Sequence, residues 1–420
     1  MKTGLKFLLF IAIVLVSPVD AREKIVEITF SGLTKTKPGY LKQFIHSEIG
    51  SDYDSLTVSN DAQNLRNLQL FLGVDVTSLD TLGGKRIVFQ CEELVTLLPI
   101  VNFGGVTDNF WFQLGGVDYN WLGKGNTLGG YYRYYDRHSF EFSLKMPYLL
   151  GRYWGFSTNL AKFSTIEPAY FETGATDYNV DHWGFLGFVR YNFSLFTTIE
   201  FGGGYLYERY EKNTSRTGAI APGPDLLDFD KYLLKLTLTH NNIDYFYHYL
   251  NGFAGELNLE TVKTVGEPAL FWKVLNIYKF FFQSGQRGNL AFRLRTGIAT
   301  NKNSPFVPFI LDNFITVRGA GNRVSRGTAE LTLNSEYRRT FLEDRSVVVQ
   351  GVAFLDMSAW RPAGGDLSEM FNNENSVRFT GLGLRFHLRK INNFVFRIDY
   401  GISLPFDDSH GVVFGAGQYF

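Results

Sequence analysis

From about residue 95 to the end of the chain, apolar and polar residues alternate with a period of two. In 288–300, Leu290 and Phe292 alternate with Asn289 and Arg293, and later segments repeat the pattern. Such alternation is typical of β-strands whose two faces meet different surroundings. It predicts sixteen strands, at 97–104, 110–121, 125–136, 139–149, 152–165, 180–193, 196–210, 229–242, 246–262, 269–282, 287–300, 327–341, 345–358, 376–389, 392–404 and 410–420.

One face of these segments is apolar and the other carries Arg, Glu and Asp. A soluble β-sandwich and a membrane barrel share this periodicity, so the pattern alone does not separate them. The strand length and the aromatic content of 16% favour an all-β transmembrane barrel of antiparallel strands, even in number. A charge facing lipid costs ~2–4 kcal/mol, so the charged face is expected to line the lumen.

The connections between the predicted strands alternate between short and long. We expect the short turns on the periplasmic side, at 123–125, 150–151, 343–344 and 392–393. We expect the long breaks on the extracellular side, at 166–179, 211–228, 301–326 and 361–375.

Residues 1–21 resemble a secretory signal peptide in composition. Two lysines precede an apolar run at 7–16, and small residues lead to Ala21. A membrane anchor is the alternative, but a spanning helix needs ~20 apolar residues. No cysteine lies near the cleavage site, which argues against a lipid anchor, and the single Cys91 excludes an internal disulfide.

Residues 22–94 combine strand and helix patterns in the order β-α-α-β-β, enough for one small core. Strands are predicted at 25–30, 73–77 and 86–92, and a helix at 40–45. A second helix is predicted after a cap at Ser59-Asn60-Asp61 and carries three leucines, Leu65, Leu68 and Leu72.

Three features of this region resemble a POTRA domain: Gly32 after the first strand, the Phe-Leu-Gly-Val step at 71–74 and Glu92 closing the third strand. A generic small α+β domain is the alternative. The resemblance implies a domain that lies in the periplasm before an outer-membrane barrel. It also implies binding of unfolded chains, partly by adding a strand at the sheet edge. We therefore expect a signal peptide at 1–21, a POTRA-like domain at 22–94 and a barrel at 95–420.

Composition and motifs exclude several function classes. The 41 basic and 41 acidic residues balance, which argues against nucleic-acid binding. We find no nucleophile elbow, zinc motif or P-loop. His387, between Arg385 and Arg389, fits lumen lining better than a catalytic base. We expect no enzyme activity, no catalytic residue, no metal and no cofactor.

An arginine lies on the glycine-rich loop between the eleventh and twelfth predicted strands, in Val317-Arg318-Gly319. Glu336 on the twelfth strand, and Phe354 and Asp356 on the thirteenth, lie on faces that the alternation turns into the lumen. A loop arginine with two carboxylates on neighbouring strands predicts a loop folded inward and held by charge-assisted hydrogen bonds.

The strand count, this loop, the Phe-x-Asp step and the Tyr419-Phe420 ending together resemble the BamA/TamA and two-partner-secretion superfamily. The resemblance implies that Arg318 pairs with Asp356 beside Glu336. It implies a non-enzymatic factor of a Gram-negative outer membrane that assembles, inserts or translocates proteins. The implied partners are unfolded or partly folded outer-membrane or exported proteins, accessory lipoproteins and outer-membrane lipid. The chain departs from the family pattern at Ala320, where an aromatic residue is usual.

The seam between the first and last strands is a candidate site for substrate strands. The last strand contains Gly415 and Gly417 and ends in Tyr419 and Phe420, which we expect to act as a C-terminal signal. Glycine weakens a strand interior, so the seam could open sideways and pair with an incoming strand. Relief of crowding at barrel closure explains these glycines equally well. A dedicated secretion pore for one partner protein and a passive porin-like channel are the competing functions.

Overall fold

The computed structural model describes residues 23–104, 111–135, 137–171, 174–217, 221–301, 308–321, 324–391, 394–405 and 409–420. The predicted signal peptide and the predicted turn at 392–393 lie outside the described residues. No helix in the described part of the chain is long and apolar enough to cross a membrane.

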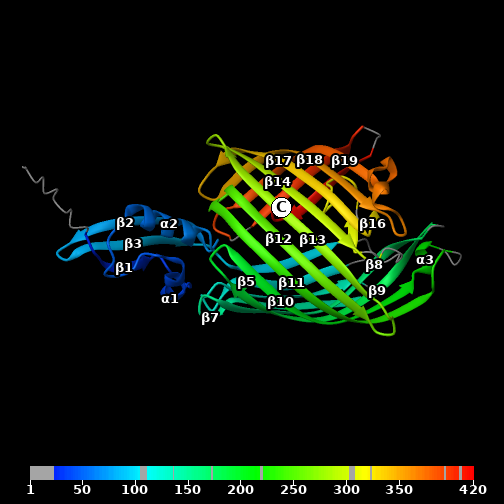
Figure 1. Ribbon diagram of the computed structural model, residues 1–420. Helices are drawn as coiled ribbons and strands as arrows, with labels where there is room; N and C mark the ends of the chain where they lie inside the picture. Colours follow the sequence, from blue (N-terminus) through cyan, green and yellow to red (C-terminus); the bar gives the residue numbers. More distant parts are fainter. Residues whose placement is uncertain are drawn as a thin grey trace, which may run out of the picture.

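The N-terminal region is a three-stranded sheet with two short helical segments and one longer helix (Figure 1). Its strand order is β1-β3-β2, with β1 parallel and β2 antiparallel to β3, so β2 has a free edge. Leu41, Leu65 and Phe89 are buried in its single core. The elements are β1 (Ile25–Ser31), α1 (Pro38–Leu41), η1 (Lys42–Phe44), α2 (Ser55–Arg66), β2 (Phe71–Thr81) and β3 (Gly84–Glu93).

The predicted cap of the second helix is wrong. Helix α2 begins at Ser55, and its N-cap is Asp54, whose carboxylate accepts two backbone N–H groups of the first turn. Asp61 lies inside the helix and is fully buried, because its carboxylate accepts the backbone N–H groups of His46 and Ser47 at 2.7 and 2.9 Å. The helix ends before two of the leucines predicted to lie on it, Leu68 and Leu72.

Sixteen strands form one antiparallel sheet that curls into a barrel (Figure 1). This confirms the predicted barrel and its strand number. The strands are β4 (Leu97–Gly104), β5 (Trp111–Trp121), β6 (Asn126–Tyr135), β7 (Arg137–Leu150), β8 (Trp154–Phe171), β9 (Gly174–Asn192), β10 (Thr197–Lys212), β11 (Leu226–Phe246), β12 (Tyr249–Thr264), β13 (Leu270–Ser284), β14 (Gly288–Ala299), β17 (Ala329–Glu343), β18 (Val347–Arg361), β19 (Ser376–Leu388), β20 (Val395–Ser403) and β21 (His410–Ala416).

Short elements lie in the long connections of the barrel. A two-stranded hairpin sits in the connection between β14 and β17, and the other elements are helical. They are α3 (Thr214–Thr217), β15 (Phe309–Leu311), β16 (Ser325–Gly327), η2 (Leu367–Phe371) and η3 (Asn373–Asn375).

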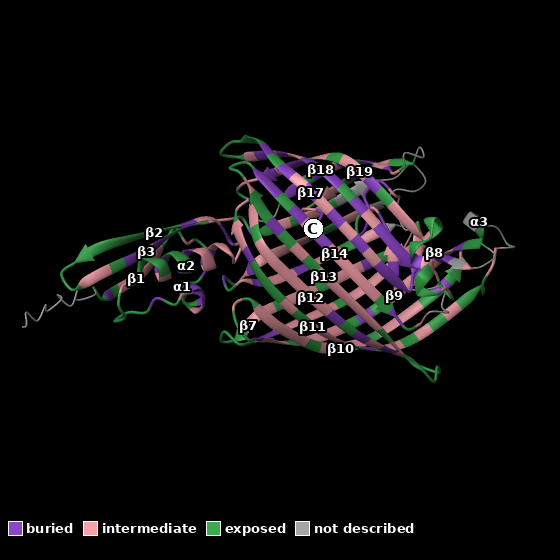
Figure 2. Ribbon diagram, turned by 45° about the horizontal axis from the view of Figure 1, so that its top comes forward, coloured by how far each residue is buried: buried purple, intermediate pink, exposed green. Residues whose placement is uncertain are grey.

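The two faces of the strands differ as the alternation predicts. On β18, Phe354 and Asp356 are 4% and 0% exposed, whereas Leu355 between them is 36% exposed. In Figure 2 buried residues are dense along β14, β17 and β18, and β10, β12 and β13 are mainly of intermediate exposure. The parts of the chain that fold into the lumen therefore pack against the wall made by β14, β17 and β18.

The predicted strand boundaries are wrong in two places. The expected break at 166–179 is instead a continuation of β8 and β9, which stay paired as far as Phe171 and Gly174. An apolar cluster that includes Tyr178 and Tyr210 packs against this extension and stabilises it. The last strand ends at Ala416 rather than at 420. Gly417 has φ +84°, a conformation that glycine adopts without steric cost, and the chain turns there into the lumen.

The two end strands of the sheet, β4 and β21, form the seam of the barrel. Between the described residues of β4 and β21 there is no ladder of backbone hydrogen bonds. Next to the seam, the N–H of Val95 donates to the carbonyl oxygen of Lys390 at 2.8 Å. Within the described chain, this seam is thus the weakest junction between neighbouring barrel strands.

Candidate functional site

The loop between β14 and β17 folds back into the lumen. Its tip begins with a turn in which the N–H groups of Thr316 and Val317 donate to the carbonyl oxygen of Asp312, at 2.9 and 3.2 Å. Arg318 follows and is 0% exposed. Gly319 has φ +93°, and a Cβ there would lie 2.9 Å from the carbonyl oxygen of Gly401, so only glycine fits.

The guanidinium of Arg318 binds both carboxylates that the sequence predicts. Its Nε and Nη2 donate to the two carboxylate oxygens of Asp356 at 2.8 and 2.9 Å, and the Arg318 backbone N–H adds a third bond at 3.1 Å. Its Nη1 donates to Oε2 of Glu336 at 2.7 Å. Every side chain in this group is 0% exposed, so water does not compete for these bonds. Such a bidentate pair fixes orientation as well as position.

Four further charged residues extend this site, and the sequence reasoning did not assign them to it. Arg338 donates through Nε to Oε1 of Glu336 at 2.5 Å. Arg385 lies 2.8 Å from Oδ1 of Asp399, which is 3.7 Å from Nη1 of Arg318. Arg397 lies 3.8 Å from Oδ2 of Asp399. Strand alternation puts Arg385, Arg397 and Asp399 on polar faces, but strand pairing across the sheet is needed to bring them to Arg318.

Two aromatic rings, one on β18 and one in the tail after β21, lie against the guanidinium of Arg318. The Phe354 ring centroid lies 3.8 Å from Cζ of Arg318, and the Tyr419 ring centroid lies 4.3 Å from it. Cations are attracted to ring faces within about 6 Å, and more strongly where water is excluded. The predicted Phe354 therefore meets the arginine, and Tyr419, which we predicted as part of a C-terminal strand signal, lies inside the barrel.

The remaining predicted residues have local roles around this site. Val317 is 0% exposed in an apolar cluster that includes Trp360 and Phe379, and Ala320 packs at the edge of that cluster. A Cβ on Gly415 would lie 2.5 Å from Nε of Arg397, so this glycine leaves room for an arginine of the site. Phe420 is 8% exposed in the lumen, and its carbonyl oxygen accepts from Nη2 of Arg338 at 3.2 Å.

The site holds parts of the chain together, and its chemistry is that of charge pairing. Among the described residues no group of three or more His, Cys, Asp or Glu side chains could hold a metal ion. Arg318, Glu336 and Asp356, with Phe354 and the tip residues Val317 and Gly319, are called the latch below. The latch joins the long loop between β14 and β17 to the strands β17 and β18.

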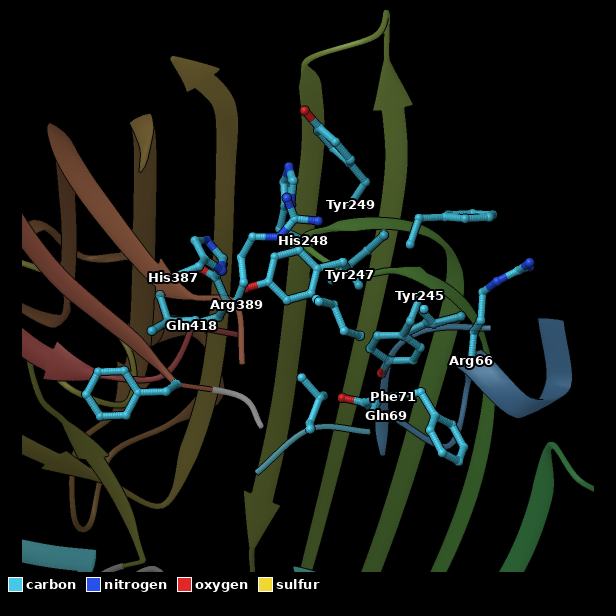
Figure 3. A pocket seen from close by; sticks show the side chains of 18 of the residues that line it. Arg66, Gln69, Phe71, Tyr245, Tyr247, His248, Tyr249, His387, Arg389 and Gln418 are labelled. Atoms are coloured by element: carbon cyan, nitrogen blue, oxygen red, sulfur yellow. The ribbon is translucent and has the colours of Figure 1, made fainter. Parts of the chain in front are cut away.

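A cavity of about 540 Å³ lies between the N-terminal region and the barrel, and it reaches Arg338 and Phe420 beside the latch. Figure 3 shows Arg66, Gln69 and Phe71 of the N-terminal region on one side of it and Tyr247, His248, His387 and Arg389 of the barrel on the other. His248 is 5% exposed, and neither ring nitrogen has a hydrogen-bond partner in the described chain. Burial and the charge of Arg389 lower the pKa of His248 to about 4, so the ring is neutral at neutral pH.

Comparisons with solved structures match nearly the whole chain. A BamA from Haemophilus ducreyi lacking POTRA domains 1–3 aligns with TM-score 0.54 and 14% identity, over 94% of this chain and 83% of that one. CdiB from Acinetobacter baumannii aligns with TM-score 0.56 and 15% identity, over 94% and 73%. CdiB from Escherichia coli aligns with TM-score 0.57 and 12% identity, over 93% and 75%. At these identities the likeness is one of fold.

No curated protein matches the sequence. The model of the Omp85 superfamily domain matches residues 120–420, which is well over half of the chain and includes the whole latch. This match, together with the sixteen-stranded barrel and its structural neighbours, confirms the resemblance found in the sequence. The chain belongs to the Omp85 superfamily of outer-membrane β-barrel proteins.

Proposed function

We propose that this protein inserts or translocates other proteins at the outer membrane, without covalent chemistry. The observation that carries the proposal is the latch, a fully buried arginine–carboxylate cluster that fixes a long loop inside a barrel with a weak seam. A passive channel does not need this combination, because a loop held in the lumen narrows the pore. A factor that handles extended chains needs an edge for pairing, and the seam offers one.

The N-terminal region supports the same proposal as a POTRA-like domain on the periplasmic side. Its contacts with the ends of barrel strands β5 and β11 include Lys35 Nζ with Oδ1 of Asp118 at 2.6 Å and the amide of Asn67 with Oδ1 of Asp244 at 3.0 Å. Residues 71–75 of β2, an end strand of its sheet, line the cavity described above. An extended chain that pairs with β2 would therefore be held beside the cavity and close to the seam.

The seam is the proposed exit for a substrate strand. The described parts of β4 and β21 share no ladder, so an incoming strand need not break backbone hydrogen bonds between them. Unpaired strand edges bind other strands readily. We propose that the substrates are unfolded or partly folded outer-membrane or exported proteins, and that lipid and accessory lipoproteins are the other partners.

A dedicated secretion pore for one partner protein is the second candidate. It is favoured by the resemblance of the strand count, the Arg318 loop and the Phe-x-Asp step to a superfamily that includes two-partner-secretion proteins. Depletion of the protein followed by proteomics of the outer membrane separates the two. Loss of many barrels supports general insertion, loss of one exported protein supports the dedicated pore, and no loss contradicts both.

A further inference from the structure

The tip of the loop touches the last two strands of the barrel as well as β17 and β18. A Cβ on Gly401 of β20 would lie 2.5 Å from the carbonyl oxygen of Arg318, and a Cβ on Gly411 of β21 would lie 2.9 Å from that of Gly319. Both neighbours are backbone atoms of the tip, so a side chain at either glycine would displace the tip itself. The tip therefore reaches the strand that forms the seam.

The tail after β21, residues 417–420, returns to the same place from the other direction. Tyr419 is 5% exposed, and its ring lies 4.3 Å from Cζ of Arg318, 4.8 Å from that of Arg397 and 5.0 Å from that of Arg293. The Tyr419 hydroxyl has no hydrogen-bond partner among the described residues. The ring face, and not the hydroxyl, makes the contact with the arginines.

Charge balance gives the tail a physical reason to stay in the lumen. Five arginines, at positions 293, 318, 338, 385 and 397, surround three carboxylates, at positions 336, 356 and 399. Buried guanidinium groups in excess of carboxylates need other electron-rich neighbours. The rings of Tyr419 and Phe420 supply them, and the carbonyl oxygen of Phe420 accepts from Arg338.

We propose that Tyr419 and Gly411 are positioning residues of the latch, and that the loop tip and the tail hold each other in place. The loop tip then helps to position the end of β21, the strand at the seam. The tail that follows β21 in turn helps to position the loop tip. Such a coupling is reciprocal, so freeing either part must loosen the other by the same factor. This inference goes beyond the proposed function and requires no substrate to test.

Two cysteine reporters measure this coupling in the folded full chain in lipid vesicles. Cys91 is buried and is replaced by Cys91→Ser to remove background. Gln418→Cys reports on the tail and Ala320→Cys on the tip, since both side chains are half-buried. The rate of labelling by a water-soluble maleimide is expected to rise about tenfold at both reporters in Tyr419→Leu. In Tyr419→Phe, which keeps the ring, both rates are expected to stay unchanged.

The contact between Gly411 of β21 and the loop tip is tested with a matched pair of glycine substitutions. Gly411→Ala pushes on the carbonyl oxygen of Gly319 and is expected to raise labelling at both reporters. Gly187→Ala, on β9, meets nothing within 4 Å and is expected to leave both rates unchanged. Heat-modifiable gel mobility confirms that each barrel is folded. If Tyr419→Leu does not fold, Gly411→Ala decides. The proposal is overturned if labelling rises at only one reporter, if neither rate changes, or if Tyr419→Phe behaves like Tyr419→Leu.

Discussion

Two charge-paired contacts join the long loop and the N-terminal region to the barrel strands, and their surroundings differ. In the latch, Arg318, Glu336 and Asp356 are all 0% exposed. Where the N-terminal region meets the barrel, the paired Lys35 and Asp118 side chains are 39% and 15% exposed. Water screens the second contact and leaves the first unscreened. The same chemistry therefore fixes one loop in a single position, and at Lys35 it adds only a small part of the attachment of the N-terminal region to the barrel.

The largest expected effect comes from removing one partner inside the latch. Asp356→Ala takes away three hydrogen bonds and leaves the guanidinium of Arg318 buried with one carboxylate fewer. Breaking a buried pair in this way costs about 3–5 kcal/mol of unfolding free energy. Urea titration in lipid vesicles measures it. Asp225→Ala is the control, because the Asp225 carboxylate in its ion pair is 91% exposed. An equal loss of unfolding free energy in both variants would contradict the difference between buried and exposed contacts.

An intermediate effect is expected at the contact of the N-terminal region. Lys35→Met removes a partly exposed pair, so we expect a loss of about 1 kcal/mol or less. The backbone N–H of Lys37 donates to the carbonyl oxygen of Gly123 at 2.9 Å, so its hydrogen exchange reports directly on docking. Exchange at Lys37 should become faster, while exchange in the β17 and β18 ladder should not change. Faster exchange in β17 would show that the two contacts are not independent.

Glu93 links the docking contact to pH. Partial burial by itself would raise the pKa of the Glu93 carboxyl, but hydrogen bonds from Thr34, Lys35 and Thr36 outweigh it and lower the pKa to about 2. Because the folded pKa is depressed, this stabilisation is complete above about pH 4.5 and is lost as pH falls towards 2. The amide shifts of Thr34 and Thr36 should therefore titrate near pH 2 in the full chain. Titration near pH 4.5 would contradict this, and Glu93→Gln should abolish it.

The smallest effect is expected for an ion pair that lies on the surface. Lys24 and Asp52 form a contact at 2.5 Å, but their side chains are 57% and 45% exposed. Pairs of this kind contribute about 0–1 kcal/mol. Lys24→Met should therefore change the urea midpoint less than Lys35→Met does. A larger change in the urea midpoint with Lys24→Met than with Lys35→Met would show that the contribution of an ion pair to stability does not follow its exposure.

The sequence predicts the barrel and the three strand residues of the latch for a simple reason. Strand alternation has a fixed period, so the faces of Glu336, Phe354 and Asp356 follow from their spacing alone. The sequence does not show which strands are neighbours of the loop tip, and so Asp399 on β20 was not assigned to the site. The tail was misjudged for a related reason. Residues 410–420 alternate like a strand, but Gly417 and the lumenal arginines turn the last residues inward.

The N-terminal region shows that a short sequence pattern alone does not identify a helix cap. Ser59-Asn60-Asp61 looks like a helix cap, because serine, asparagine and aspartate are the usual capping residues. The actual cap is Asp54, and Asp61 is buried because it binds backbone N–H groups of the segment 46–47. Only the folded core brings that segment close enough to satisfy a buried carboxylate.

The central claim is that Arg318 holds the loop in the position that the proposed function needs. Arg318→Ala, expressed in place of the native protein, tests it most directly when the abundance of other outer-membrane and exported proteins is measured. We expect a folded barrel at normal abundance with reduced levels of its substrates, and unchanged levels with Arg209→Ala, which alters an exposed arginine of β10. Normal substrate levels with Arg318→Ala, at normal abundance of the variant, would contradict the claim.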